Sequence, residues 1–115
     1  MLQGVRIIEM ANVISGPFAG MLLADMGADV IKVEAPGRGD PFRMWAVSED
    51  SIAPSFAAYN RGKRSVTLDT RADAGRRAYL RLIAGADVVI DTTTMETAAA
   101  GVDKVLRMVE KDRHA

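Results

Sequence analysis

Residues 5–34 read VRIIEMANVISGPFAGMLLADMGADVIKVE, and this stretch decides the fold. The apolar run Val5–Met10 contains β-branched residues and predicts a strand. A helix is expected next, because Pro17 suits a first helical position and Gly27 is typical of a helix end. Asp29–Glu34 is the next predicted strand. A strand, a helix and a strand in this order predict a right-handed β–α–β unit with parallel strands.

Ser15 or Gly16 is expected to cap the helix of this unit, with Pro17 at the first helical position. The side chains of this helix, which include Phe18, Met21 and Leu22, are apolar around most of the helix surface. That pattern is typical of a buried helix, so we expect this one to lie deep in the core.

The same alternation continues along the chain. Ser65–Asp69 and Asp87–Asp91 predict two further strands. Between them a helix is expected to follow Thr70–Asp73, which resembles a capping box, and to end at Gly85. A last amphipathic helix is predicted over residues 102–109, where apolar residues recur at helical spacing.

Short, nearly all-apolar strands that alternate with helices predict an α/β fold. We expect a parallel sheet of about four strands flanked by helices, with residues 1–115 as a single domain. With 49% hydrophobic and 26% charged residues, the composition is that of a globular protein and argues against intrinsic disorder.

Composition also excludes several kinds of chemistry. The chain has no cysteine, and its only histidine is His114, so disulfide scaffolds, thiol nucleophiles and histidine-based zinc or Ser-His-Asp sites are not expected. Basic and acidic residues balance at 15 each, so we expect neither nucleic acid nor a membrane as a partner. Without a signal-peptide pattern, a cytoplasmic location is expected.

In parallel sheets of this kind, ligands bind beyond the carboxyl ends of the strands. The four expected ends are Ala11–Ser15, Glu34–Arg38, Leu68–Arg71 and Asp91–Thr94. These four segments are therefore the candidate binding site. Residues 35–59 form a predicted long loop with a short helix near its end, and loops of this length in compact domains are usually functional or mobile.

A dinucleotide site is disfavoured, because the first turn has one glycine where the fingerprint needs three and Pro17 removes a backbone donor. Glu34 is accordingly interpreted as a solvated carboxylate at a strand end. The basic run Arg61–Arg64, with Arg71 after it, either holds phosphate groups or forms a solvated turn. Trp45, in the long loop, either lines a ligand or covers the core, and we favour the core.

Seven motifs in the chain belong together. They are LQGVRIIE at 2–9, GPFA at 16–19, LADMGADVIKVE at 23–34, PGRGD at 36–40, NRGKRS at 60–65, LD at 68–69 and ADVV at 86–89. In combination they resemble the opening of the family III CoA-transferases, which include formyl-CoA transferase, carnitine CoA-transferases and alpha-methylacyl-CoA racemase. The resemblance covers about Leu2–Ile90 and is far more specific than any single motif.

The resemblance implies a Rossmann-like domain that binds coenzyme A or an acyl-CoA as substrate and needs no metal. By position, the residues it implies as CoA contacts are Val13, Ile14, Ser15, Ala35, Leu68, Arg71, Thr92 and Thr93. Arg71 would meet a phosphate oxygen, and the backbone around Leu68 would meet the adenine. Two departures stand out: Ala35 replaces a common arginine, and Asp91–Glu96 replaces the family's Glu-Asn-Phe-x-Pro-Gly.

In the family III CoA-transferases, a catalytic aspartate carries the CoA during transfer between an acyl-CoA and a carboxylic acid. That aspartate lies downstream of the position of Ala115, and the family's chains interlock as dimers. The resemblance therefore implies that this chain contributes no catalytic residue, binds CoA at most, and is a fragment, a truncated product or a split-enzyme subunit. We expect it to form a homo-oligomer or to dock to a second chain that supplies the catalytic part.

Two alternatives stay open. The first is an acyl-CoA racemase or epimerase of the same superfamily, which would abstract a proton alpha to the thioester. The second is a non-catalytic CoA-binding or assembly subunit, which the short length, Ala35 and the missing Pro-Gly turn favour.

Overall fold

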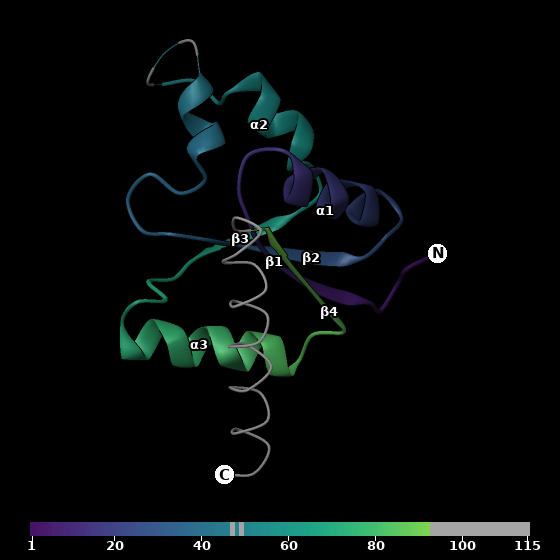
Figure 1. Cartoon of the computed structure of the whole chain (residues 1–115). Coiled ribbons are helices and arrows are strands. Elements are labelled where there is room, and N and C mark those ends of the chain that lie inside the picture. Colours follow the sequence, from purple (N-terminus) through teal and green to yellow (C-terminus); the bar gives the residue numbers. More distant parts are fainter. Residues whose placement is uncertain (47, 49, 93–115) are drawn as a thin grey trace.

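Four parallel strands form the centre of the computed structural model, which describes residues 1–46, 48 and 50–92. In chain order the strands are β1 Arg6–Ala11, β2 Asp29–Glu34, β3 Arg64–Thr67 and β4 Val88–Thr92. The order across the sheet is β3-β2-β1-β4, and every neighbouring pair is parallel. The expected α/β fold with a parallel sheet flanked by helices is confirmed (Figure 1).

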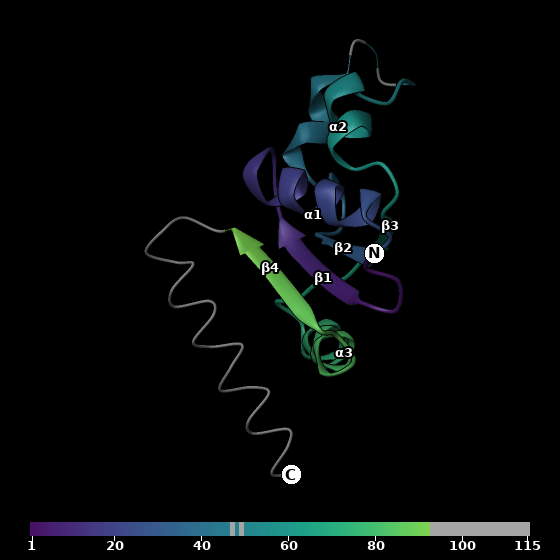
Figure 2. The same cartoon turned by 90° about the vertical axis from the view of Figure 1, so that its right-hand side faces the viewer.

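Helices cover both faces of this sheet. They are α1 Ser15–Asp25, the 3-10 helix η1 Pro41–Trp45, α2 Pro54–Tyr59 and α3 Asp73–Ala84. In Figure 2, α1 and α2 lie on one side of the sheet and α3 on the other. The β3–α3–β4 connection places β4 beside β1, so the strand order reverses direction there.

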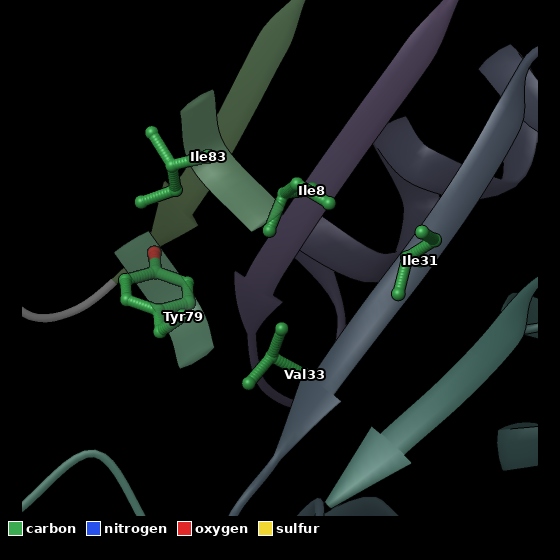
Figure 3. Packing of buried hydrophobic residues seen from close by; sticks show 5 residues of the cluster. All are labelled: Ile8, Ile31, Val33, Tyr79 and Ile83. Atoms are coloured by element: carbon green, nitrogen blue, oxygen red, sulfur yellow. The ribbon is translucent and has the colours of Figure 1, made fainter. Parts of the chain in front are cut away.

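The strands have alternating side chains that serve two separate cores. Ile8, Ile31 and Val33 pack against Tyr79 and Ile83 of α3, as Figure 3 shows. On the opposite face, residues one position earlier, such as Ile7 and Val30, pack beneath α1. Because both faces of β1 and β2 are covered, most of their residues are buried, whereas the edge strand β3 is mostly exposed. A charged residue buried inside β1 or β2 therefore needs a partner.

The start of α1 differs from the expectation. The helix begins at Ser15 with Ile14 as its N-cap, and no side chain caps it, so the expected Ser15 or Gly16 cap is wrong. The expected deep burial is wrong as well. Its small residues face the sheet, whereas Ile14, Phe18, Leu22 and Met26 are each 41–47% exposed. These four recur every fourth residue and form an exposed apolar stripe along α1.

The start of α3 also differs from the expectation. The N-cap is Ala72, without a side-chain bond, so Thr70–Asp73 is not a capping box. Asp69 organises this region instead: its side chain accepts the Arg71 N–H at 3.1 Å, and its carbonyl accepts the Ala72 N–H at 3.1 Å. This turn delays the helix to Asp73. The end near Gly85 is confirmed, and the predicted helix at 102–109 lies outside the described residues.

Candidate functional site

The carboxyl ends of the strands gather along one edge of the sheet. Ala11 at the end of β1 is level with Thr92 at the end of β4, and Glu34 is level with Thr67. Beyond the β1 end lies the turn to α1, which is followed along the same edge by Ala35 and Leu68. Open α/β sheets bind ligands at such edges, where the strand order reverses, which here is between β1 and β4.

The sequence-predicted residues are exposed to different degrees on this edge. Val13, Ile14 and Ser15 form the turn between β1 and α1, with Ile14 and Ser15 exposed and Val13 half-buried. Ala35 is exposed just after β2. Thr92 is the last residue of β4, and Thr93 lies outside the described residues.

Leu68 and Arg71 lie at the β3 end of the edge. Leu68 is half-buried, and its N–H donates to the Glu34 carbonyl at 3.0 Å. The side chain of Arg71 is 87% exposed and contacts only the Asp69 carboxylate, at 3.2 Å, among the described residues. This hydrogen bond from Arg71 lowers the pKa of Asp69. The guanidinium is thus held loosely over the edge, with most of its donors facing solvent.

Four buried charged side chains lie next to this edge, and the sequence analysis did not identify them as a group. We call them the buried quartet: Glu9, Lys32, Asp40 and Lys63. The Lys32 ammonium lies 2.9 Å from both Glu9 Oε2 and Asp40 Oδ2. It also donates to the Ala11 carbonyl at 2.8 Å, at the end of β1. The four side chains are at most 2% exposed, and their formal charges sum to zero.

Lys63 completes the buried quartet from the segment before β3. Its ammonium lies 2.6 Å from Glu9 Oε1 and donates to the Pro17 carbonyl and to Asn60 Oδ1, each at 2.9 Å. Burial lowers the pKa of Lys63, and the Glu9 carboxylate opposes that effect. The quartet thereby ties β1, β2, α1 and the α2–β3 connection together beneath the turn.

The basic run at 61–64 is divided among three carboxylates. Lys63 is buried against Glu9, Arg61 pairs with Asp25 at 2.7 Å, and Arg64 pairs with Asp29 at 2.7 Å. The solvated-turn interpretation therefore suits the two exposed arginines and is wrong for Lys63. Glu9, the partner of Lys63, is 54 positions earlier in the chain, and spacing along the sequence does not reveal this pair.

Glu34 is not a solvated carboxylate, and that interpretation is wrong. It is 5% exposed and accepts hydrogen bonds from Arg43 at 2.7 and 2.8 Å, from Ser65 and from the Asp40 N–H. Burial alone would raise the pKa of Glu34, but these hydrogen bonds outweigh it and lower the pKa to about 2. Glu34 thus fastens the 35–43 segment to the ends of β2 and β3.

Replacing Glu34 with glutamine is expected to flatten the acid dependence of stability. The pKa is about 2 in the fold and about 4.5 without these contacts, so the stabilisation is complete above pH 5 and is lost as pH falls towards 2. Because Arg43 is 39% exposed, we expect about 2 kcal/mol at pH 7 from this group. Urea unfolding of both proteins between pH 7 and 3 measures it. A difference between them that does not shrink with falling pH would contradict the assignment.

Trp45 does not cover the core. It is 60% exposed, so the favoured interpretation is wrong. Phe42 takes the buried position instead, at 1% exposure, with Ala53 and Phe56. The Trp45 ring packs edge-to-face on Phe42 with centroids 4.7 Å apart. The single turn of η1 points only one of these two aromatic residues inward.

Two negative findings concern the described residues alone. Across 1–46, 48 and 50–92, no three histidine, cysteine, aspartate or glutamate side chains are grouped so that they could hold a metal ion. In the same ranges no helix has the length and apolar character needed to cross a membrane.

Known proteins are similar to this chain in sequence and in fold. The profile of CoA-transferase family III matches residues 2–104. A succinate–glutarate CoA-transferase of Agrobacterium fabrum is 48% identical over 97 residues, which are 78% of this chain and 24% of that protein. A succinyl-CoA:mesaconate CoA-transferase of Haloarcula hispanica is 41% identical over 109 residues, covering 89% of this chain and 28% of that protein.

A solved structure agrees with these relatives. The crystal structure of a CAIB/BAIF family protein from Brucella suis superposes with a TM-score of 0.77 at 44% identity, and it covers 90% of this chain and 27% of that one. The chain spans about a quarter of the length of the curated relatives it matches.

Proposed function

Because the chain belongs to CoA-transferase family III, we propose that it is the CoA-binding part of an enzyme that moves CoA between an acyl-CoA and a carboxylic acid. The family match over residues 2–104 carries this proposal. The two curated relatives named above are a succinate–glutarate CoA-transferase and a succinyl-CoA:mesaconate CoA-transferase, and they support an acyl-CoA as the small-molecule partner. We take residues 1–115 as a single CoA-binding domain in the cytoplasm.

The carboxyl edge of the sheet supplies the proposed contacts. The turn at Val13–Ser15 and Ala35 would contact CoA, and the Leu68 backbone would meet the adenine. Arg71, with its exposed guanidinium, would pair with a phosphate oxygen of CoA. Thr92 and Thr93 are proposed as further CoA contacts, as the family resemblance implies.

The reactive carboxylate is proposed to come from outside these 115 residues. The family resemblance implies a catalytic aspartate downstream of the position of Ala115, and covalent transfer requires that nucleophile. The exposed apolar stripe on α1 supports association with a second copy or with a second chain that supplies the catalytic part. The racemase alternative uses the same CoA-binding edge and differs only in that missing part.

Titration calorimetry with CoA tests the binding proposal. We expect the chain to bind CoA and Arg71→Ala to weaken binding about five- to tenfold, because one charge-assisted hydrogen bond is lost at an exposed position. Arg77→Ala is the matched control, since it removes another exposed arginine from α3, and it should leave the affinity unchanged. Absence of heat at millimolar CoA would instead favour the non-catalytic assembly subunit. Equal losses in the two variants would remove Arg71 from the site.

A further inference from the structure

Val13 has a backbone conformation that valine rarely adopts. Its φ is +66°, and it is the one non-glycine residue with a positive φ in the part of the chain that the structure describes. A β-branched side chain is disfavoured in this left-handed region, so the surrounding structure must hold the residue there. Val13 is also the first residue of the turn that the proposed function assigns to CoA.

Asp40 keeps Val13 in this conformation through a hydrogen bond. Its side chain is fully buried, and its Oδ1 accepts the Val13 N–H at 3.1 Å and the Phe42 N–H at 2.9 Å. Its Oδ2 faces the Lys32 ammonium at 2.9 Å. The Val13 side chain packs against the cluster around Phe42. Asp40 thus contacts the turn from the loop after β2, 27 positions further along the chain.

The two ends of the turn are fixed by one pair of side chains. Lys32 donates to the Ala11 carbonyl at 2.8 Å, and Asp40 accepts from the Val13 N–H two residues later. Because Lys32 and Asp40 are themselves paired, the positions of both backbone groups are set together.

We propose that Asp40 is a positioning residue that holds the β1–α1 turn in its ligand-binding shape before the ligand arrives. A turn that is already ordered does not lose conformational freedom on binding, and the affinity rises accordingly. This inference rests on the proposed function, because it assigns the turn to CoA. Its structural half, that Asp40 fixes Val13, stands without the ligand.

Two substitutions at position 40 separate positioning from stability. Asp40→Asn keeps a carbonyl oxygen for the Val13 and Phe42 N–H groups but loses the charge that Lys32 faces. Asp40→Ala loses both. We expect both variants to be less stable than the unaltered chain. Only Asp40→Ala should weaken CoA binding, by roughly ten- to a hundredfold, because the strained turn then loses the hydrogen bond that fixes Val13. Val30→Ala is the control, because it destabilises the core beneath α1 without touching the turn.

Amide hydrogen exchange gives a readout that does not need CoA. The exchange rate of the Val13 amide is compared with that of Ile8, in the middle of β1, within each variant. The ratio should rise at least about tenfold in Asp40→Ala and stay constant in Asp40→Asn and Val30→Ala. If Asp40→Ala does not fold, Lys32→Met with Asp40→Ala replaces it, because Glu9 and Lys63 then remain paired and no charge is buried alone. Its reference is Lys32→Met with Asp40→Asn, which also lacks the Lys32 contact to the Ala11 carbonyl but keeps an acceptor for Val13.

The outcomes distinguish the two claims. An unchanged exchange ratio in Asp40→Ala, or an equal loss of CoA affinity in Asp40→Ala and Val30→Ala, overturns the positioning role. If the unaltered chain and Val30→Ala both fail to bind CoA, the proposed function of this chain fails, and the exchange ratio alone decides whether Asp40 fixes the turn.

Discussion

Replacing Lys32 with methionine is expected to lower the free energy of unfolding by about 3–5 kcal/mol. Lys32 is the only ammonium within ion-pair distance of Asp40 among the described residues, and it also neutralises Glu9. Methionine has a similar volume, so packing is nearly kept and the loss reports the charge. Glu9 would then keep Lys63 as its partner, and the buried Asp40 carboxylate would have no ammonium within ion-pair distance among the described residues. Urea unfolding at pH 7 measures the difference from the unaltered chain.

A matched control for this prediction is Arg61→Met. Arg61 also pairs with a carboxylate, Asp25, but its side chain is 55% exposed, so its loss should cost less than about 1 kcal/mol. Lys32→Met combined with Asp40→Ala should regain part of the loss, since the remaining Glu9 and Lys63 balance each other. A Lys32→Met protein no less stable than Arg61→Met would show that the buried quartet does not form as described.

Gly20→Ala is expected to destabilise the chain by about 3 kcal/mol, although alanine is the better helix former. An added Cβ at position 20 would lie 2.0 Å from Glu9 Oε1 and 3.1 Å from the Cε of Lys63. The Glu9 carboxylate cannot move aside without leaving the two ammonium groups that hold it. Glycine at this position therefore lets α1 approach the buried quartet. Thermal and urea unfolding of the variant measure the effect.

The sign of this effect is diagnostic. On helix propensity alone, Gly20→Ala would stabilise α1 by about 1 kcal/mol. Ala19→Gly, at the neighbouring helical position, gives the size of that propensity in the same helix. If Gly20→Ala stabilises the protein by a similar amount, α1 does not pack as closely on Glu9 as the structure has it.

The sheet followed from the sequence because its signals are local. β1, β2 and β4 contain short runs of Val and Ile, and strand neighbours are set by right-handed crossovers, so four parallel strands with helices on both faces could be predicted. The helix starts could not. Asp69 forms a turn with its own neighbours and moves the start of α3 to Asp73, a competition that a capping pattern does not express.

The location of the candidate site could be predicted from the sequence, but the contacts that hold its segments in position could not. Parallel strands put their carboxyl ends on one edge, so segments such as Val13–Ser15 and Leu68 were identified as neighbours. The contacts that hold them join distant positions, as in Lys63 with Glu9, and spacing along the chain carries no sign of these. A usable signal existed in Glu9 and Lys32, since a charged residue inside a strand buried on both faces must have a partner.

The prediction of a buried Trp45 failed, and the strained conformation of Val13 could not be predicted, for a related reason. The conformation of Val13 depends on Asp40, and the exposure of Trp45 depends on whether Phe42 or Trp45 turns inward from η1. Both outcomes are decided by tertiary contacts between segments whose residue types allow either arrangement.

The buried quartet has a consequence for how this sequence can diverge. Its two acids and two lysines come from four separate segments, yet each charge is tolerated only because the others are there. A mutation that alters one member leaves an uncompensated charge in the interior, so these positions are expected to persist unchanged or to be exchanged in oppositely charged pairs over evolutionary time. Substitutions at the four positions would then be expected to occur together, even though their codons lie far apart in the gene.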